Sequence, residues 1–220
     1  KLLASRSVEL NERWTAVASL VALRERWSYD TDTATGARVY NYSTLVYPEL
    51  TGSYIGVDNR LFPRHGLSAQ VALRGGAKGA GSDTSFVQGW GNARWFQGIG
   101  QADRLILRAE GGATWSQDPI ALSPSLRFFA GGDRSIRGYA WREVGPRTPP
   151  PDNFALGGRY VVTASAEYEH YFKGGPWGMA AFVDTGDAFD NKNDFSLRTG
   201  VGVGARWRSP IGGVRIDIAH

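Results

Sequence analysis

The sequence predicts an all-β protein whose antiparallel strands form a transmembrane β-barrel. Three observations lead to this fold class. Apolar and polar residues alternate over many segments, short and long connections alternate along the chain, and aromatic residues gather near segment ends. Each is a property of barrels that cross outer membranes. Glycine, at 29 of 220 residues, is also about twice as frequent as in average proteins.

The alternation is clearest over residues 197–208, where valines and Trp207 oppose arginines and glycines. Small residues dominate such apolar faces and long arginines occupy the polar ones, which favours a lipid-facing wall over a soluble sandwich. Within 38–57, Pro48 predicts a bulge or the edge of a ladder. The same period predicts ten strands, at residues 2–10, 13–29, 38–57, 67–78, 84–97, 104–115, 160–172, 177–189, 197–208 and 214–219.

The connections between these segments alternate in length, so the longer loops are expected on one rim and the tight turns on the other. This is the arrangement of outer loops and periplasmic turns in outer-membrane barrels. The tight turns are residues 11–12, 98–102, 173–176 and 209–213, and the connection 58–65, on the same rim, is somewhat longer. The loops of the other rim are 30–37, 79–83, 116–158 and 190–194. The aromatic residues expected at the two membrane interfaces are Trp14, Trp27, Tyr29, Trp95, Trp115, Trp177 and Trp207.

Composition argues against several other classes of protein. The chain has no cysteine, which excludes disulfides and thiolate chemistry within it. The net charge of +4 is spread without a basic stripe, so no nucleic-acid partner is expected. No apolar run is long enough for a membrane-spanning helix, and the first residues do not read as a signal peptide.

No catalytic, cofactor-binding or metal-binding constellation is expected. The three histidines, His65, His170 and His220, are scattered, and no serine has a neighbouring histidine to activate it. Residues 200–204 resemble a phosphate-binding loop, but no helix follows them. Their glycines are interpreted as relieving crowding where the sheet bends. The protein is therefore predicted not to be an enzyme.

The long connection 116–158 is the most informative segment, because structureless loops longer than about 15 residues are usually functional or disordered. It carries a glycine pair, an Ile136-Arg137-Gly138-Tyr139 tip and a proline run. On the strands that follow, alternation points Glu167, Phe182 and Asp184 to the face opposite the lipid. Two carboxylates on adjacent strands are thus available to an arginine inside the barrel.

Residues 128–139 resemble the signature loop of the bacterial surface antigen superfamily of outer-membrane assembly and translocation proteins. Within that superfamily the amino-acid sequence of this loop most resembles the TamA family, the outer-membrane subunits of the translocation and assembly module. The resemblance runs from about residue 45 to the end of the chain. Four further stretches carry it, namely 58–66, 164–168, 181–186 and 209–219.

The resemblance implies a barrel of about sixteen strands preceded by periplasmic POTRA domains. The ten strands of residues 1–220 would be the sixth to the fifteenth. The chain is accordingly expected to be a partial barrel domain without the POTRA domains, the first strands and the closing strand. Ten strands at that curvature cannot close, and open edges do not survive in lipid.

The resemblance also implies that the loop folds into the lumen, where Arg137 would meet Glu167 and Asp184. Gly138 would allow a tight turn, and Tyr139 and Phe182 would cover the ion pair. Gly131 and Gly132 are interpreted as hinges. The full set of motif residues implied in the loop is Gly131, Gly132, Asp133, Arg134, Ile136, Arg137, Gly138 and Tyr139, and their wall partners are Glu167, Phe182 and Asp184.

The function implied is that of a non-enzymatic outer-membrane insertase or translocation subunit that assists assembly of autotransporters and other β-barrel proteins. Its partners would be the lipid of the bacterial outer membrane, unfolded outer-membrane proteins and a periplasm-spanning TamB-like protein. Two alternatives belong to the same superfamily: a two-partner secretion pore that exports a partner protein, and a general β-barrel assembly factor of the BamA kind. No cofactor is implied by any of them.

Overall fold

A computed structural model describes residues 1–31, 38–118, 121–150 and 152–220. The loop expected at 30–37 therefore lies largely outside the described residues. The described chain contains ten strands and three short 3-10 helices, in the order β1 Leu2–Glu9, β2 Trp14–Thr31, β3 Arg38–Val57, β4 His65–Gly76, β5 Phe86–Ile99, β6 Asp103–Ser116, η1 Pro124–Leu126, β7 Tyr160–Tyr171, η2 Phe172–Gly174, β8 Trp177–Phe189, η3 Lys192–Asp194, β9 Arg198–Ser209 and β10 Gly212–Ala219. In the part of the chain described, no helix is long and apolar enough to cross a membrane.

The ten strands form one antiparallel sheet in which each strand pairs with its sequence neighbours. Fold class, strand number and strand bounds agree with the sequence prediction to within two residues at each end. Of the two alternatives predicted at Pro48, the bulge is not found there. Pro48 pairs in register with Leu20, and the only shift between β2 and β3 falls between Trp27 and Asp30.

Pro48 does lie at the edge of a ladder, because the β3–β4 pairing begins one residue later, at Glu49. The backbone N–H groups of Thr44 and Val46 point away from β2 to Asp83 and Ser82. Backbone groups alternate sides along a strand, so the proline nitrogen faces the same side. The missing donor therefore falls where no ladder hydrogen bond is needed.

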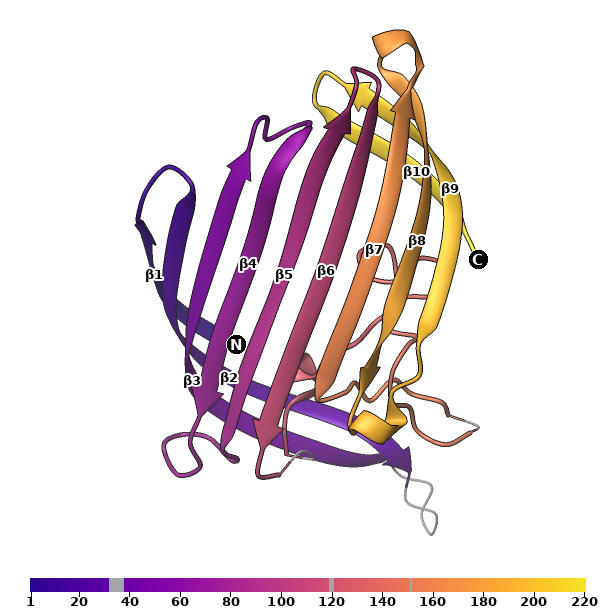
Figure 1. Cartoon of the computed structure of the whole chain (residues 1–220). Coiled ribbons are helices and arrows are strands. Elements are labelled where there is room, and N and C mark those ends of the chain that lie inside the picture. The colour runs from indigo at the N-terminus through magenta and orange to yellow at the C-terminus, as the bar shows by residue number, and fades with distance from the viewer. Residues whose placement is uncertain (32–37, 119–120, 151) are drawn as a thin grey trace.

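The sheet curves strongly, and its longer connections leave one rim while its tight turns leave the other (Figure 1). The convex face exposes apolar side chains, among them Leu73, Val183 and Val203 at 41–60%. An apolar face of this extent is that of a barrel wall in contact with lipid. The concave face carries charged side chains, among them Glu167, Glu169 and Arg206, and also the apolar residues on which the long loop packs.

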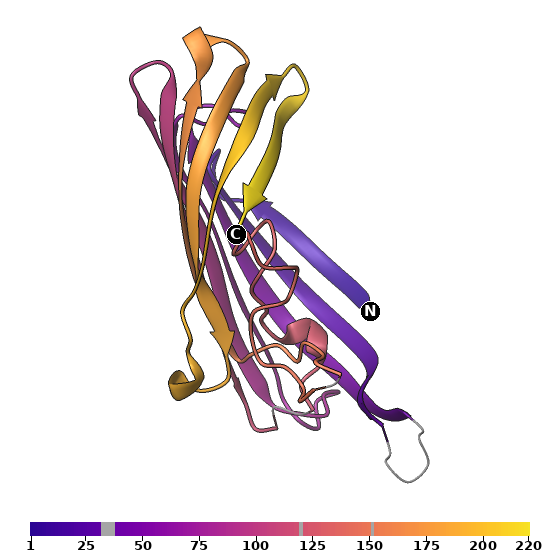
Figure 2. The same ribbon diagram turned by 90° about the vertical axis from the view of Figure 1, so that its right-hand side faces the viewer.

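The long connection between β6 and β7 lies on the concave side of the sheet (Figure 2). Two small apolar clusters fix it there. Leu122 and Leu126 pack with wall residues of β2, β3 and β5. Further along, Ile136 and Val144 pack with Val161 of β7 and with the β8 residue Ala188. The loop is thus a packed part of the barrel interior.

Candidate functional site

The wall side of the site is built by regular pairing of β7 with β8. Glu167 lies opposite Phe182, and Ser165 lies opposite Asp184. Because side chains alternate along each strand, all four point to the concave face. Glu167 and Asp184 are 6% and 0% exposed, and Phe182 is 6% exposed. The inward orientation predicted for the two carboxylates and the phenylalanine is present.

The loop tip is shaped by glycines in the left-handed region. Gly131, Gly132 and Gly138 have φ angles of 97°, 100° and 97°, a conformation that only glycine adopts without strain. The amide of Gly132 donates to the carbonyls of Ile136 and Tyr139, at 3.2 and 3.0 Å. These bonds close a compact turn, so Gly131 and Gly132 form its bend within a hydrogen-bonded unit.

Arg137 projects from this turn into the wall and is 4% exposed. Its Nε and Nη2 donate to the two oxygens of Asp184 at 2.6 and 3.0 Å, and its Nη1 donates to Glu167 at 2.6 Å. Its backbone amide also donates to Asp184, at 3.0 Å. The fork-shaped guanidinium therefore bridges both carboxylates that the sequence offered it.

Phe182 forms the floor of this contact. Its ring centroid lies 3.3 Å from the guanidinium carbon of Arg137, which is within the range of a cation–π interaction. Tyr139 does not share this role. It packs on the apolar cluster that contains Ile136 and Val144, because the left-handed turn at Gly138 redirects the chain after Arg137.

The Arg137 contact belongs to a larger ion-pair network. Arg206 of β9 donates to Glu167 at 2.7 Å and to Glu169 at 3.1 Å, and it also pairs with Asp217 of β10. Arg137 itself reaches Asp217 at 3.1 Å. The network joins four guanidinium groups and four carboxylates, namely Arg104, Arg108, Arg137, Arg206, Glu167, Glu169, Asp184 and Asp217.

The inward glycines of β9 relieve crowding, as the sequence predicted. A Cβ on Gly200 would overlap the carbonyl oxygen of Arg137, and one on Gly202 would overlap the Phe182 ring. A Cβ on Gly204 would overlap the carboxylate of Asp217. These positions leave room for the loop tip and its partners, so the crowding comes from the loop and the residues that bind it.

Of the remaining motif residues, one is buried and holds the loop in place, and two are exposed to solvent. Ile136 is fully buried in the loop's apolar cluster. Asp133 and Arg134 are exposed. Asp133 approaches Arg215 of β10 at 3.5 Å, and the carbonyl of Arg134 accepts a hydrogen bond from Arg108 at 3.1 Å.

The electrostatics favour a permanently charged Arg137. Burial opposes the charge, but hydrogen bonds to Asp184 and Glu167 outweigh it and raise the pKa of the guanidinium. Removing one member of a buried, hydrogen-bonded ion pair costs about 3–5 kcal/mol. The arrangement therefore acts as a clamp that holds the loop tip against the wall.

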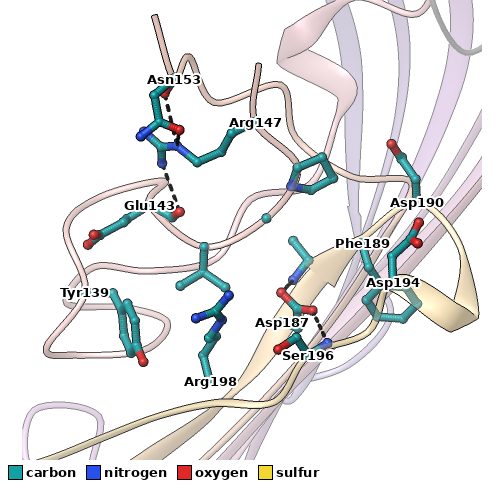
Figure 3. Close-up of a pocket in the computed structure, with 14 residues that line it drawn as sticks. Tyr139, Glu143, Arg147, Asn153, Asp187, Phe189, Asp190, Asp194, Ser196 and Arg198 are labelled. Atoms are coloured by element: carbon teal, nitrogen blue, oxygen red, sulfur yellow. Dashed lines mark hydrogen bonds between the residues drawn. The ribbon is translucent and has the colours of Figure 1, made fainter. Parts of the chain in front are cut away.

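A separate hollow of about 450 Å³ lies under the outer arm of the loop (Figure 3). On the loop side, Arg147 donates to the carbonyls of Asn153 and Glu143, at 3.0 and 2.9 Å. On the wall side, Asp187 accepts from the backbone amide of Ser196 at 2.7 Å. Each of these side chains is bound within its own segment, so the hollow does not gather them into a site.

Sequence reasoning missed Arg206 and Asp217 as members of the site. Alternation placed both on the polar face, so a signal was present. Their depth in the barrel relative to the loop tip depends on the β9–β10 register, in which Asp217 lies opposite Gly204. That register is fixed by the turn at residues 210–211, which the alternation does not specify.

A family model described as the Omp85 superfamily domain matches residues 5–220. This chain belongs to the Omp85 superfamily. The Omp85 match agrees with the family resemblance of the loop motif at the level of the superfamily.

Two relatives of this Omp85 chain are each named "Outer membrane protein assembly factor BamA". The protein from Nitratidesulfovibrio vulgaris is 29% identical over 164 residues, which covers 72% of this chain and 20% of the relative. The protein from Neorickettsia risticii is 28% identical over 179 residues, covering 74% and 23%. The chain thus spans about a fifth of the length of these relatives.

A solved structure shares the fold. The crystal structure of BamA from Haemophilus ducreyi lacking POTRA domains 1-3 superposes with a TM-score of 0.82 at 17% identity. The match covers 99% of this Omp85 chain and 49% of that structure. The ten-stranded sheet is accordingly the fold of part of that barrel.

Proposed function

We propose that this chain is barrel wall from an outer-membrane protein that assists the insertion or translocation of other β-barrel proteins. The protein lies in the bacterial outer membrane, acts on unfolded outer-membrane proteins, and uses neither catalysis nor a cofactor. The superfamily assignment and the relatives named as assembly factors support this proposal. So does the apolar convex face, which fits a lipid bilayer.

The observation that carries the proposal is the docking of Arg137 on Asp184 and Glu167. A soluble chain carrying a buried ion-pair network across five strands would gain little stability from it over a well-packed apolar core. A barrel that must keep a lumenal loop in one place needs such a directional contact. The loop tip is therefore the working element of the proposed function.

Two kinds of assembly factor fit the chain. The amino-acid sequence of residues 128–139 favours the TamA kind, which would assist the assembly of autotransporters and would bind a periplasm-spanning TamB-like partner. The two relatives favour a general assembly factor of the BamA kind. The loop geometry is compatible with both.

Depletion of the intact protein from its own cell distinguishes these kinds. Loss of autotransporters with normal levels of other barrel proteins supports the TamA kind, and a general loss of barrel proteins supports the BamA kind. Re-expression of the Arg137→Ala variant should fail to restore assembly, although the variant protein reaches the membrane. Normal assembly by that variant would contradict the proposed role of the loop tip.

A further inference from the structure

Asp217 of β10 receives guanidinium groups from two different parts of the chain. Nη1 of Arg137, in the loop, donates to Oδ2 at 3.1 Å. Nη1 of Arg206, in β9, donates to Oδ1. The two oxygens of this carboxylate are thus divided between the loop tip and the wall.

We propose that Asp217 and Arg206 are positioning residues that couple the loop tip to the β9–β10 hairpin. The inference rests on the proposed function, in which the loop tip works from a docked position. Arg206 also binds Glu167, the carboxylate that receives the same Nη1 of Arg137. It therefore orients two of the three carboxylates that hold the loop arginine.

A second contact ties the loop tip to the same hairpin without using charge. A Cβ on Gly138 would lie 2.8 Å from the carbonyl carbon of His220, and Gly200 lies directly beneath the carbonyl of Arg137. His220 in turn pairs with Val201 through backbone hydrogen bonds of 2.8 and 2.9 Å. The carbonyl of Arg137 and the following residue, Gly138, thus rest on the hairpin.

Charge balance gives the coupling its direction. With Arg137 in place, the network's four guanidinium groups match its four carboxylates. Withdrawal of the loop tip leaves one carboxylate in excess. Asp217 is 15% exposed at its side chain, whereas Asp184 is fully buried. Asp217 is therefore the carboxylate best able to regain water, and β10 is the strand that loosens.

Coupling of this kind is reciprocal, so a change in the hairpin must also loosen the loop tip. A cysteine pair tests this, because the 220 residues contain no native thiol. Asp133 and Arg215 approach each other at 3.5 Å, so Asp133→Cys and Arg215→Cys place one thiol in the loop and one on β10. A short bis-maleimide, which adds to a thiol at each end, then measures their proximity in the intact protein, in native outer-membrane vesicles.

In this background Asp217→Asn should lower the cross-linking rate by about fivefold, which corresponds to a coupling of about 1 kcal/mol. The matched control is Glu49→Gln, which removes a lumenal pair of 3.1 Å with Arg74 and touches no loop residue. It should leave the rate unchanged. An unchanged rate in Asp217→Asn would mean that Asp217 only neutralises Arg206, and the inference would be overturned.

The reverse direction is measured by hydrogen exchange. Arg137→Lys should raise amide exchange in β10 by about fivefold more than it raises exchange in β4. Equal increases in both strands would indicate general destabilisation and contradict specific coupling. Neither readout involves substrate, so a failure here leaves the proposed assembly function standing, and a failure of assembly leaves this coupling testable.

Discussion

The guanidinium carbon of Arg137 lies 3.3 Å from the ring centroid of Phe182. Phe182 stands two residues before Asp184, whose carboxylate the same guanidinium binds. One strand thus supplies both an aromatic floor and an anionic partner. Gly202 on the next strand lacks the Cβ that would displace the ring. The arginine is held in place by this floor as well as by charge.

Replacing Phe182 by leucine should therefore weaken loop docking while leaving the carboxylates in place. We expect a loss of about 1–2 kcal/mol, because a desolvated cation–π contact contributes that much. The measurement is the temperature at which the barrel unfolds, read from its change of migration on an SDS gel after heating. Phe96→Leu serves as the control, since Phe96 is a buried inward residue of β5 with no arginine stacked on it among the described contacts. Equal losses of stability in both variants would contradict a specific contribution of the contact between Phe182 and Arg137.

Arg137→Lys should be nearly as harmful as Arg137→Ala. A lysine has one point of attachment and cannot bridge Asp184 and Glu167 as the guanidinium fork does. Each variant should lower the free energy of unfolding by about 3–5 kcal/mol.

A double-mutant cycle with Asp184→Ala checks the contact itself. The two losses should be far from additive, since either change removes the same ion pair. Fully additive losses would show that the two side chains act independently. Urea titration of the barrel in detergent micelles provides the free energies for both variants.

Gly200→Ala should displace the loop tip although it changes no charge. The new Cβ would overlap the carbonyl of Arg137, and the backbone there cannot turn aside as a flexible side chain can. We expect faster tryptic cleavage after Arg137, read by mass spectrometry. Gly111→Ala is the matched control, because Gly111 also lies within a strand and has nothing within 4 Å of the added Cβ. Wild-type cleavage in Gly200→Ala would contradict the packing role.

The sequence predicted the features of the site that depend on one strand alone, and it did not predict those that depend on what packs against the strand. Regular alternation along β7 and β8 was enough to predict that Glu167 and Asp184 point inward, because the face to which a side chain points depends only on its position along its own strand. The crowding that Gly200 relieves was predicted, but its source, the carbonyl of Arg137, was not, since a glycine in a strand gives no local signal for what lies above it. Tyr139 was misplaced for a related reason: a single left-handed residue changes the direction of every residue after it.

A pH effect is expected at the turn between β3 and β4, on the rim of tight turns. Burial would raise the pKa of Asp58, but the backbone amides of Arg64, His65 and Asn59 outweigh it and lower the pKa below its ordinary value of 3.8. Asp58 accepts from the amides of Asn59 and Arg64 at 2.8 and 2.9 Å. A lowered pKa means that the turn is fully stabilised above the ordinary value and loses this stabilisation as the pH falls through the lowered one.

Hydrogen exchange of residues 58–66, corrected for the intrinsic pH dependence of exchange, should therefore show protection that falls at acidic pH in the wild type. Asp58→Asn cannot ionise, so its protection should be lower at neutral pH and should not change over the same range. Asp133→Asn provides the control, because its carboxylate lies in the loop and its ion-pair partner among the described residues is Arg215, at 3.5 Å. If Asp58→Asn kept the acid-dependent loss, another group would have to govern the turn, and the hydrogen-bonded carboxylate could not be the cause.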